Sequence, residues 1–238
     1  LAEADLEAAT ICDRAYAAMS LGAVDGASEP VAFDAAIVRD ARGRIELIAD
    51  LRDALASGAV DIVFQPIVDM GTGRCTGAEA LARWARNGKP VSPADFIPLA
   101  EQTGLTFDIF TLGVNRAAQV VKMHAKANEP FYVSVNLSPR DLERPELVPH
   151  VVHLLARNGM AREPLKMEVT EQLLVNDSAV PEKNLSALKS LGCRLAIDDF
   201  GTGYSSLSYI GKLPTHMLKL DRQFIVGLSQ DPATQAIV

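Results

Sequence analysis

From Ile62 onward, short apolar runs alternate with longer segments of helical spacing, and this alternation constrains the fold more than any other feature of the sequence. Six runs have the length of strands: Ile62–Val68, Cys75–Leu81, Phe131–Leu137, Leu165–Val169, Leu195–Ile197 and Met217–Leu220. Strands separated by helices are typical of a parallel sheet with helical crossovers. The pattern therefore predicts an α/β fold, either a (β/α) barrel or an open doubly wound sheet.

The segments between these strands complete the predicted alternation. The polar turn Met70–Gly73 is too short for a crossover, so it predicts a hairpin between the first two strands. Helices are expected at Pro93–Gln102, Phe107–Ala127, Pro139–Asn158, Gln172–Leu191, Tyr204–Ile210 and Asp221–Leu228. Glycines after two of these segments, Gly159 and Gly192, are typical helix stops.

The first part of the chain has a different pattern. Residues 1–20 have the spacing of a helix, and a short strand is expected over Val31–Phe33 and Ala35–Val38. The polar stretch Arg39–Gly43 predicts a joint, and a second helix is expected from Arg44 to Ser57. We therefore predict an N-terminal helix and linker segment of residues 1–42 and a larger domain of residues 43–238.

Composition limits the classes of function. The chain has 238 residues, 48% of them hydrophobic, which is enough for a substantial core. Its net charge of −7 argues against binding duplex nucleic acid. Three cysteines without paired spacing fit a reducing compartment, and no apolar run has the length of a membrane span. A cytoplasmic location of this domain is expected. A longer protein that carries a membrane anchor elsewhere would also agree with these features.

The stretch from Ile197 to Ser206 places two adjacent carboxylates, Asp198 and Asp199, where a strand meets its loop. Successive side chains of a strand point to opposite faces, so both can serve one site only if the chain turns between them. Gly201 and Gly203 make such a turn accessible, because glycine adopts positive φ at little cost. Two close carboxylates repel each other unless a cation neutralises them. The alternative for this dipeptide alone is a solvated acidic turn.

Polar residues also end the other predicted strands after the first. These residues are Glu79, Asn136, Glu168 with Glu171, and Lys219. In parallel α/β folds the carboxyl ends of the strands meet at one edge, where sites form. Ligands that offer only oxygen suit Mg²⁺ or Mn²⁺ rather than Zn²⁺, and a lysine beside them suits a phosphoryl group or an activated water.

These residues lie in motifs that resemble a known family. The motifs are Gln65-Pro66-Ile67-Val68, Glu79-Ala80-Leu81 followed by Arg83-Trp84, Asn136-Leu137-Ser138, Glu168-Val169-Thr170-Glu171, Asp198-Asp199-Phe200-Gly201-Thr202-Gly203 and Lys219-Leu220-Asp221. In order and spacing they are similar to the EAL-domain family, the cyclic di-GMP phosphodiesterases of bacteria. The resemblance runs from about Ile45 to Val238.

The resemblance implies a modified TIM (β/α)8 barrel whose first strand is antiparallel to the others. It also implies metal-dependent hydrolysis of one phosphodiester of cyclic di-GMP to linear pGpG, with two Mg²⁺ or Mn²⁺ ions. Carried over by motif, the implied metal ligands are Glu79, Asn136, Glu168, Asp198 and, for the second metal, Asp199. Catalytic roles are implied for Lys219, Glu171 and Asp199, with Glu171 holding the Asp-Asp-Phe-Gly loop, and Gln65 and Arg83 match positions that contact substrate.

The resemblance also implies partners and leaves alternatives. The stretch Asp13–Tyr16 resembles the tail of a GGDEF diguanylate cyclase domain, and a plain helical linker is the alternative for this segment. An upstream GGDEF or sensory domain is expected, and homodimerisation is typical of the family. One alternative is a catalytically inactive EAL-type receptor or regulatory module that binds cyclic di-GMP. Another is a different metal-using TIM barrel that acts on another phosphate ester.

The family pattern continues beyond the sixth strand of this chain. It has a seventh strand that ends in Glu-Gly-Val-Glu and an eighth with Gln-Gly, and both are absent from the 238 residues. We expect a longer protein at both ends, because no initiator Met is present and the helix expected after Asp231 is not completed. If the chain really ends at Val238, we expect weak hydrolysis or none.

Overall fold

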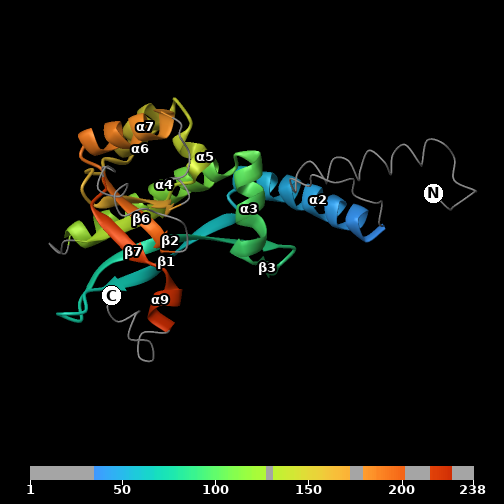
Figure 1. The fold of residues 1–238 in the computed structure, drawn as a ribbon, viewed down its shortest axis with the longest axis horizontal. Coiled ribbons are helices and arrows are strands. Elements are labelled where there is room, and N and C mark those ends of the chain that lie inside the picture. Colours follow the sequence, from blue (N-terminus) through green and yellow to red (C-terminus); the bar gives the residue numbers. More distant parts are fainter. Residues whose placement is uncertain (1–34, 127–130, 172–178, 202–214, 227–238) are drawn as a thin grey trace, which may run out of the picture. The chain divides into compact units, whose positions relative to one another are not determined.

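The computed structural model describes residues 35–126, 131–171, 179–201 and 215–226, and gives side chains from residue 42 (Figure 1). Contacts divide the chain between Ala54 and Leu55 into two units. The helix and strand predicted over residues 1–20 and 31–33, and the helix predicted over 204–210, lie outside the described residues. None of the helices in the described ranges is long and apolar enough to cross a membrane.

Helix α2 (Ala35–Ser57) corrects part of the sequence prediction. The strand expected over Ala35–Val38 and the polar joint after it are wrong, because the backbone is helical throughout this range. Alanine, leucine and arginine recur along the segment and favour a helix, and Gly43 alone costs only about 1 kcal/mol. The helix is continuous across residues 42 and 43, and a division into domains at that position stays a prediction.

Strands β1 (Val60–Val68) and β2 (Cys75–Arg86) form the predicted hairpin. They pair antiparallel, and the side chain and carbonyl of Asp69 accept hydrogen bonds from the turn that joins them. A further short strand, β3 (Lys89–Val91), pairs antiparallel with β2 and was missed by the sequence analysis. Its signal was Asn87-Gly88, with φ of 52° and 75°, which is the two-residue turn typical of tight hairpins.

The remaining strands are parallel. They are β4 (Tyr132–Asn136), β5 (Leu165–Thr170), β6 (Arg194–Phe200) and β7 (Met217–Leu220). Together the seven described strands form one sheet in the order β1-β2-β4-β5-β6-β7, with β3 beside β2. The α/β class with an antiparallel first strand is thereby confirmed, and the sheet is that of a modified TIM barrel.

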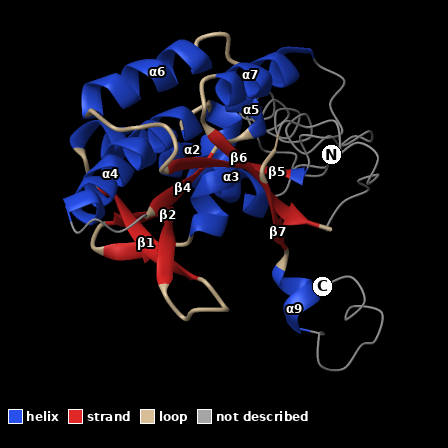
Figure 2. Cartoon of the chain, turned by 90° about the vertical axis from the view of Figure 1, so that its left-hand side faces the viewer, coloured by secondary structure: helices blue, strands red, loops and turns tan. Residues whose placement is uncertain are grey.

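Helices follow the strands as the alternation predicts (Figure 2). Those after β3 are α3 (Pro93–Thr103), α4 (Thr106–Lys126), α5 (Pro139–Leu142), α6 (Leu147–Asn158), α7 (Ala179–Ser190) and α9 (Arg222–Val226). The single helix expected over Pro139–Asn158 is wrong, since α5 and α6 are separate. Pro145 explains the break, because proline disfavours helical backbone at the residue before it and cannot donate a hydrogen bond.

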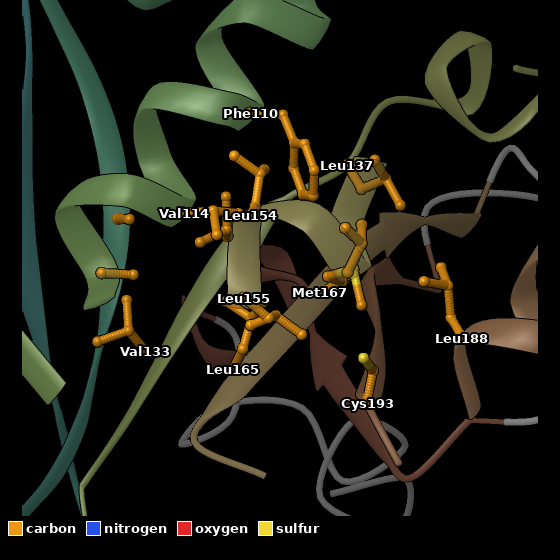
Figure 3. Packing of buried hydrophobic residues seen from close by; sticks show 14 of the residues in the cluster. Phe110, Val114, Val133, Leu137, Leu154, Leu155, Leu165, Met167, Leu188 and Cys193 are labelled. Carbon is orange, nitrogen blue, oxygen red and sulfur yellow. The ribbon is translucent and has the colours of Figure 1, made fainter. Parts of the chain in front are cut away.

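The main core lies between one face of the sheet and helices α4, α6 and α7 (Figure 3). Phe110 of α4, Leu154 of α6 and Leu188 of α7 are each no more than 1% exposed. They pack in one cluster with alternate residues of the strands, such as Val133 of β4 and Met167 of β5. Burying each such side chain contributes about 1.5–3 kcal/mol. The intervening residues of the same strands point to the other face of the sheet, where the polar side chains lie.

Candidate active site

The polar face of the sheet collects side chains from the carboxyl ends of the parallel strands. Register pairs Asn136 of β4 with Glu168 of β5, and Thr170 of β5 with Asp198 of β6. Paired residues of neighbouring strands share a face, so these polar groups line one side. The apolar neighbours of Glu168, which are fully buried in the core, fix which way it points. The core therefore sets the position of the site.

Lys219 of β7 is the centre of this cluster. Its Nζ donates to Glu79 Oε2 at 3.1 Å, to Glu168 Oε2 at 2.5 Å and to Asp198 Oδ2 at 3.0 Å. The side chain of Glu168 is 1% exposed, that of Lys219 is 25% exposed, and those of Glu79 and Asp198 are 19% exposed. One ammonium thus bridges carboxylates from three strands, a contact set that we call the Lys219 cluster.

The charged groups of the Lys219 cluster shift one another's pKa values. Burial raises the pKa of Glu168; Lys219 opposes that rise, while Glu79 and Asp198 add to it. Burial works to lower the pKa of Lys219, but the surrounding carboxylates, Glu168 foremost, outweigh it and the net direction is upward. Lys219 is therefore held as a cation at neutral pH, and three carboxylates against one ammonium leave an excess of negative charge.

This donor set fits a divalent cation. Carboxylate oxygens of Glu79, Glu168 and Asp198 lie within 4.8 Å of one another. Asn136 belongs to the same constellation, since its Nδ2 donates to Glu79 Oε1 at 3.1 Å. The ammonium of Lys219 lies among these oxygens and shows that the arrangement accommodates positive charge. Oxygen ligands of this kind suit Mg²⁺ or Mn²⁺.

Asp199 lies in a turn at the end of β6 rather than in the group of three carboxylates. Its φ is 52°, and its backbone N–H donates to Asp198 Oδ1 at 2.9 Å. Burial raises the pKa of Asp199, and the neighbouring charges of Asp198 and Asp221 raise it further. The turn that two adjacent site carboxylates require is thus present, with a positive φ at Asp199 itself as well as at Gly201.

Glu171 follows β5 and contacts the same turn. Its Oε2 accepts a hydrogen bond from the backbone N–H of Gly201 at 2.7 Å, and the residue is only 3% exposed. The structure therefore places Glu171 against the loop and not among the carboxylates around Lys219.

Gln65 and Arg83 lie at the margin of the cluster. Gln65 of β1 is directly opposite Glu79 of β2 and is exposed. Arg83 is four residues beyond Glu79 on β2, or about 13 Å along the strand. Its Nη1 donates to the carbonyl of Ala82 at 2.8 Å, and the side chain is exposed. Neither contacts Lys219 in the structure, and both remain open to a ligand.

A cavity of about 370 Å³ adjoins the turn and adds residues that the sequence analysis missed. Its lining comprises Glu101, Gln102, Ser138, Pro139, Arg140, Thr170, Glu171 and Asp199. Arg140 reaches the end of α3, where its Nη1 donates to the carbonyls of Glu101 and Gln102. Burial raises the pKa of Glu101, and the charge of Asp141 raises it further. Ser138 caps α5, and a serine followed by proline is a recognisable helix start in the sequence. That signal would have placed Arg140 in the first turn of a helix just after β4.

The chain is similar to proteins of known family. A family model described as the EAL domain matches residues 48–238. The bifunctional diguanylate cyclase/cyclic di-GMP phosphodiesterase MucR of Pseudomonas aeruginosa is 36% identical over 213 residues, which are 87% of this chain and 30% of that protein. The cyclic di-GMP phosphodiesterase NbdA of the same organism is 36% identical over 207 residues, or 85% of this chain and 26% of that protein. The chain spans less than a third of the length of the curated relatives that it matches.

Solved structures are similar over the same region. The PaMucR phosphodiesterase in complex with c-di-GMP has a TM-score of 0.74 and 36% identity, covering 81% of this chain and 78% of that one. The cAMP-bound form of the EAL enzyme Bd1971 has a TM-score of 0.75 and 30% identity, covering 84% of this chain and 57% of that one. The family match covers the whole sheet and every residue of the Lys219 cluster. The chain belongs to the EAL domain family.

Proposed function

We propose that this chain hydrolyses one phosphodiester of cyclic di-GMP to linear pGpG in bacterial second-messenger signalling. The observation that carries the proposal is the Lys219 cluster, in which one partly buried cation and three carboxylates from different strands meet at the carboxyl ends of the parallel strands. Relatives named as cyclic di-GMP phosphodiesterases, at 36–37% identity, support the same reaction and substrate.

Glu79, Asn136, Glu168 and Asp198 would hold the first of two Mg²⁺ or Mn²⁺ ions, and Asp199 would serve the second. Bound there, the metal supplies an acidified water and positive charge for the phosphate. The ammonium of Lys219 lies beside these ligands, where it stabilises negative charge that develops on the phosphoryl oxygens. Glu171 would act indirectly, because its carboxylate holds the backbone of the turn that carries Asp198 and Asp199.

Gln65 and Arg83 are the residues that we assign to substrate binding. A cyclic dinucleotide is longer than a single phosphate, so part of it extends from the cluster along β2. Arg83, about 13 Å further along that strand, presents a guanidinium suited to a phosphate or a base edge. Gln65 faces the same side at the level of Glu79.

The remaining proposals concern the longer protein. We propose that the chain acts in the cytoplasm as part of a homodimer, with a GGDEF or sensory domain upstream. MucR, a bifunctional relative, supports the pairing with a cyclase domain. Sedimentation of the full-length protein and a cyclase assay would test these two points separately.

The test is turnover of cyclic di-GMP with Mg²⁺ or Mn²⁺, followed by chromatography of pGpG. Glu79→Gln keeps the size of the side chain but removes a charged ligand, so the rate should fall at least about 100-fold. The matched control is Glu163→Gln, which changes an exposed glutamate at the opposite end of β5. An unchanged rate in Glu79→Gln would refute the assignment. Binding of cyclic di-GMP without any pGpG, from the full-length protein as well as from the unaltered chain, would favour a receptor instead.

A further inference from the structure

The turn Asp198–Gly201 adopts a conformation that needs support. Asp199 and Gly201 both have positive φ, 52° and 98°, and the pairing of β6 with β7 shifts register between Ile197 and Phe200. Left-handed backbone costs most residues other than glycine about 1–2 kcal/mol, and aspartate less, because its short side chain can hydrogen-bond locally. Such a conformation persists only where surrounding contacts hold it. The contacts that hold this turn therefore decide where its two carboxylates lie.

One support is polar and comes from β5. The buried carboxylate of Glu171 accepts the hydrogen bond of the Gly201 N–H. The other support comes from α9, beyond β7. The ring of Phe224 lies so close to Gly201 that a Cβ added there would be 2.3 Å from Cε2 and 2.4 Å from Cζ. Gly201 is thus enclosed between a carboxylate and an aromatic ring.

The residues before Phe224 reinforce this contact. The Asp221 N–H donates to the carbonyl of Phe200 at 3.4 Å, and Gln223 Nε2 donates to the carbonyl of Gly201 at 3.4 Å. The Phe224 N–H closes the first turn of α9 on Asp221 O at 3.1 Å. Lys219, five residues before Phe224, binds Asp198 at the start of the turn. A single short segment, residues 219–224, therefore contacts the turn at both ends.

We propose that Phe224 is a positioning residue of the metal site. Its ring acts through Gly201: it fixes the turn so that Asp198 stays bound to Lys219 and Asp199 stays beside Asp198. The inference rests on the proposed function only in assuming that the site binds a metal ion. It does not depend on which substrate the site takes. The contact also gives a second reason for glycine at position 201. Besides the positive φ, any side chain there would displace the Phe224 ring.

The test is calorimetric titration of the 238-residue chain with Mn²⁺ in the absence of nucleotide. Phe224→Ala should weaken Mn²⁺ affinity about 10-fold, the range typical of residues that orient metal ligands. Phe224→Leu, which refills part of the space, should recover much of the affinity. The control is Ile225→Ala, which truncates the next residue of α9, 52% exposed, and should leave affinity unchanged. Circular dichroism establishes that each variant is folded.

If Phe224→Ala does not fold, Phe224→Leu serves in its place, alone and in the double variant, and a second variant tests the same contact from the side of Gly201. Gly201→Ala pushes the ring away from its position and also strains the backbone at φ 98°, so it should weaken Mn²⁺ binding at least about 10-fold, and the comparison with the Phe224 variants isolates the share of the ring. Because both changes break one contact, the double variant should be little worse than Gly201→Ala alone. Unchanged Mn²⁺ affinity in the folded single variants, or losses that simply multiply in the double variant, would overturn the proposal.

The same titration separates this inference from the proposed function. If the unaltered chain binds Mn²⁺ but neither it nor the full-length protein releases pGpG, the proposed reaction fails and Phe224 is still judged by metal affinity. If pGpG forms normally while Phe224→Ala binds Mn²⁺ as tightly as the unaltered chain, the positioning role fails alone. If the unaltered chain binds no Mn²⁺, both are wrong.

Discussion

Replacing Lys219 with methionine should destabilise the metal-free protein in a way that depends on pH. Methionine keeps the length of the side chain but removes the charge that Glu79, Glu168 and Asp198 share. Removing one partner of a buried ion pair costs about 3–5 kcal/mol. The side chains here are 1–25% exposed rather than fully buried, so the lower end, about 3 kcal/mol, is expected.

The direction of the pH dependence follows from the pKa shifts. The pKa of Lys219 is raised in the folded protein, so its contribution to stability is fully present below the unfolded value of about 10.4. It is lost only as pH rises through the folded value. Toward acid pH the carboxylates gain protons, and Glu168 does so early because burial raises its pKa. The gap between Lys219→Met and the unaltered chain should therefore be widest near pH 8 and narrower at about pH 5.

Thermal unfolding followed by circular dichroism, with chelator present, measures this effect. A loss of about 3 kcal/mol corresponds to a fall of about 6–12 °C in Tm for a domain of this size. Lys183→Met, an exposed lysine of α7, serves as the control and should change Tm little. Adding Mn²⁺ should restore part of the stability of Lys219→Met, because a divalent cation neutralises the same carboxylates. An equal fall in Tm at both pH values would contradict the reasoning.

Two further variants test contacts outside the site by chemical denaturation. Asn184→Ala removes the buried amide that donates to the carbonyls of Leu142 and Arg144, at 2.7 and 2.9 Å, and should lower the free energy of unfolding by about 1–3 kcal/mol. Gly88→Ala places a side chain at φ 75° in the β2–β3 turn and should cost about 1–2 kcal/mol. A loss below a few tenths of a kcal/mol in either variant would contradict the corresponding contact.

The sequence predicted which residues belong to the site better than it predicted which of their side chains contact one another. Strand ends could be located from apolar runs, and parallel strands bring such ends to one edge, so Glu79, Glu168 and Asp198 were expected together. The central position of Lys219 could not be read from the chain. Its three partners are 140, 51 and 21 residues away, and the relative stagger of four strands decides which of them it reaches.

Local signals misled the prediction where longer patterns dominate. Ile37 and Val38 favour a strand over a few residues, but they belong to a segment of 23 residues whose other members favour a helix. In the opposite direction, Asn87-Gly88 is a strong local signal that was overlooked, because the strand it introduces has only three residues. The conformational preferences of two residues are enough to determine a short turn, whereas a long helix is determined by helix propensities summed over many residues.

Strand β5 shows why the core and the site cannot vary independently. Leu165, Met167 and Val169 are each no more than 1% exposed, and they alternate with Lys166 and Glu168. A slip of β5 by one residue would turn the apolar set toward the site and drive Glu168 into the cluster around α4 and α6. Burying that carboxylate without Lys219 would cost several kcal/mol, and the apolar side chains would lose their packing as well. The same packing that stabilises the domain therefore holds Glu168 at the height of Glu79 and Asp198. For this reason we expect large-to-small changes in β5 packing, such as Met167→Ala, to lower Mn²⁺ affinity together with stability, even though Met167 lies on the core face of the strand.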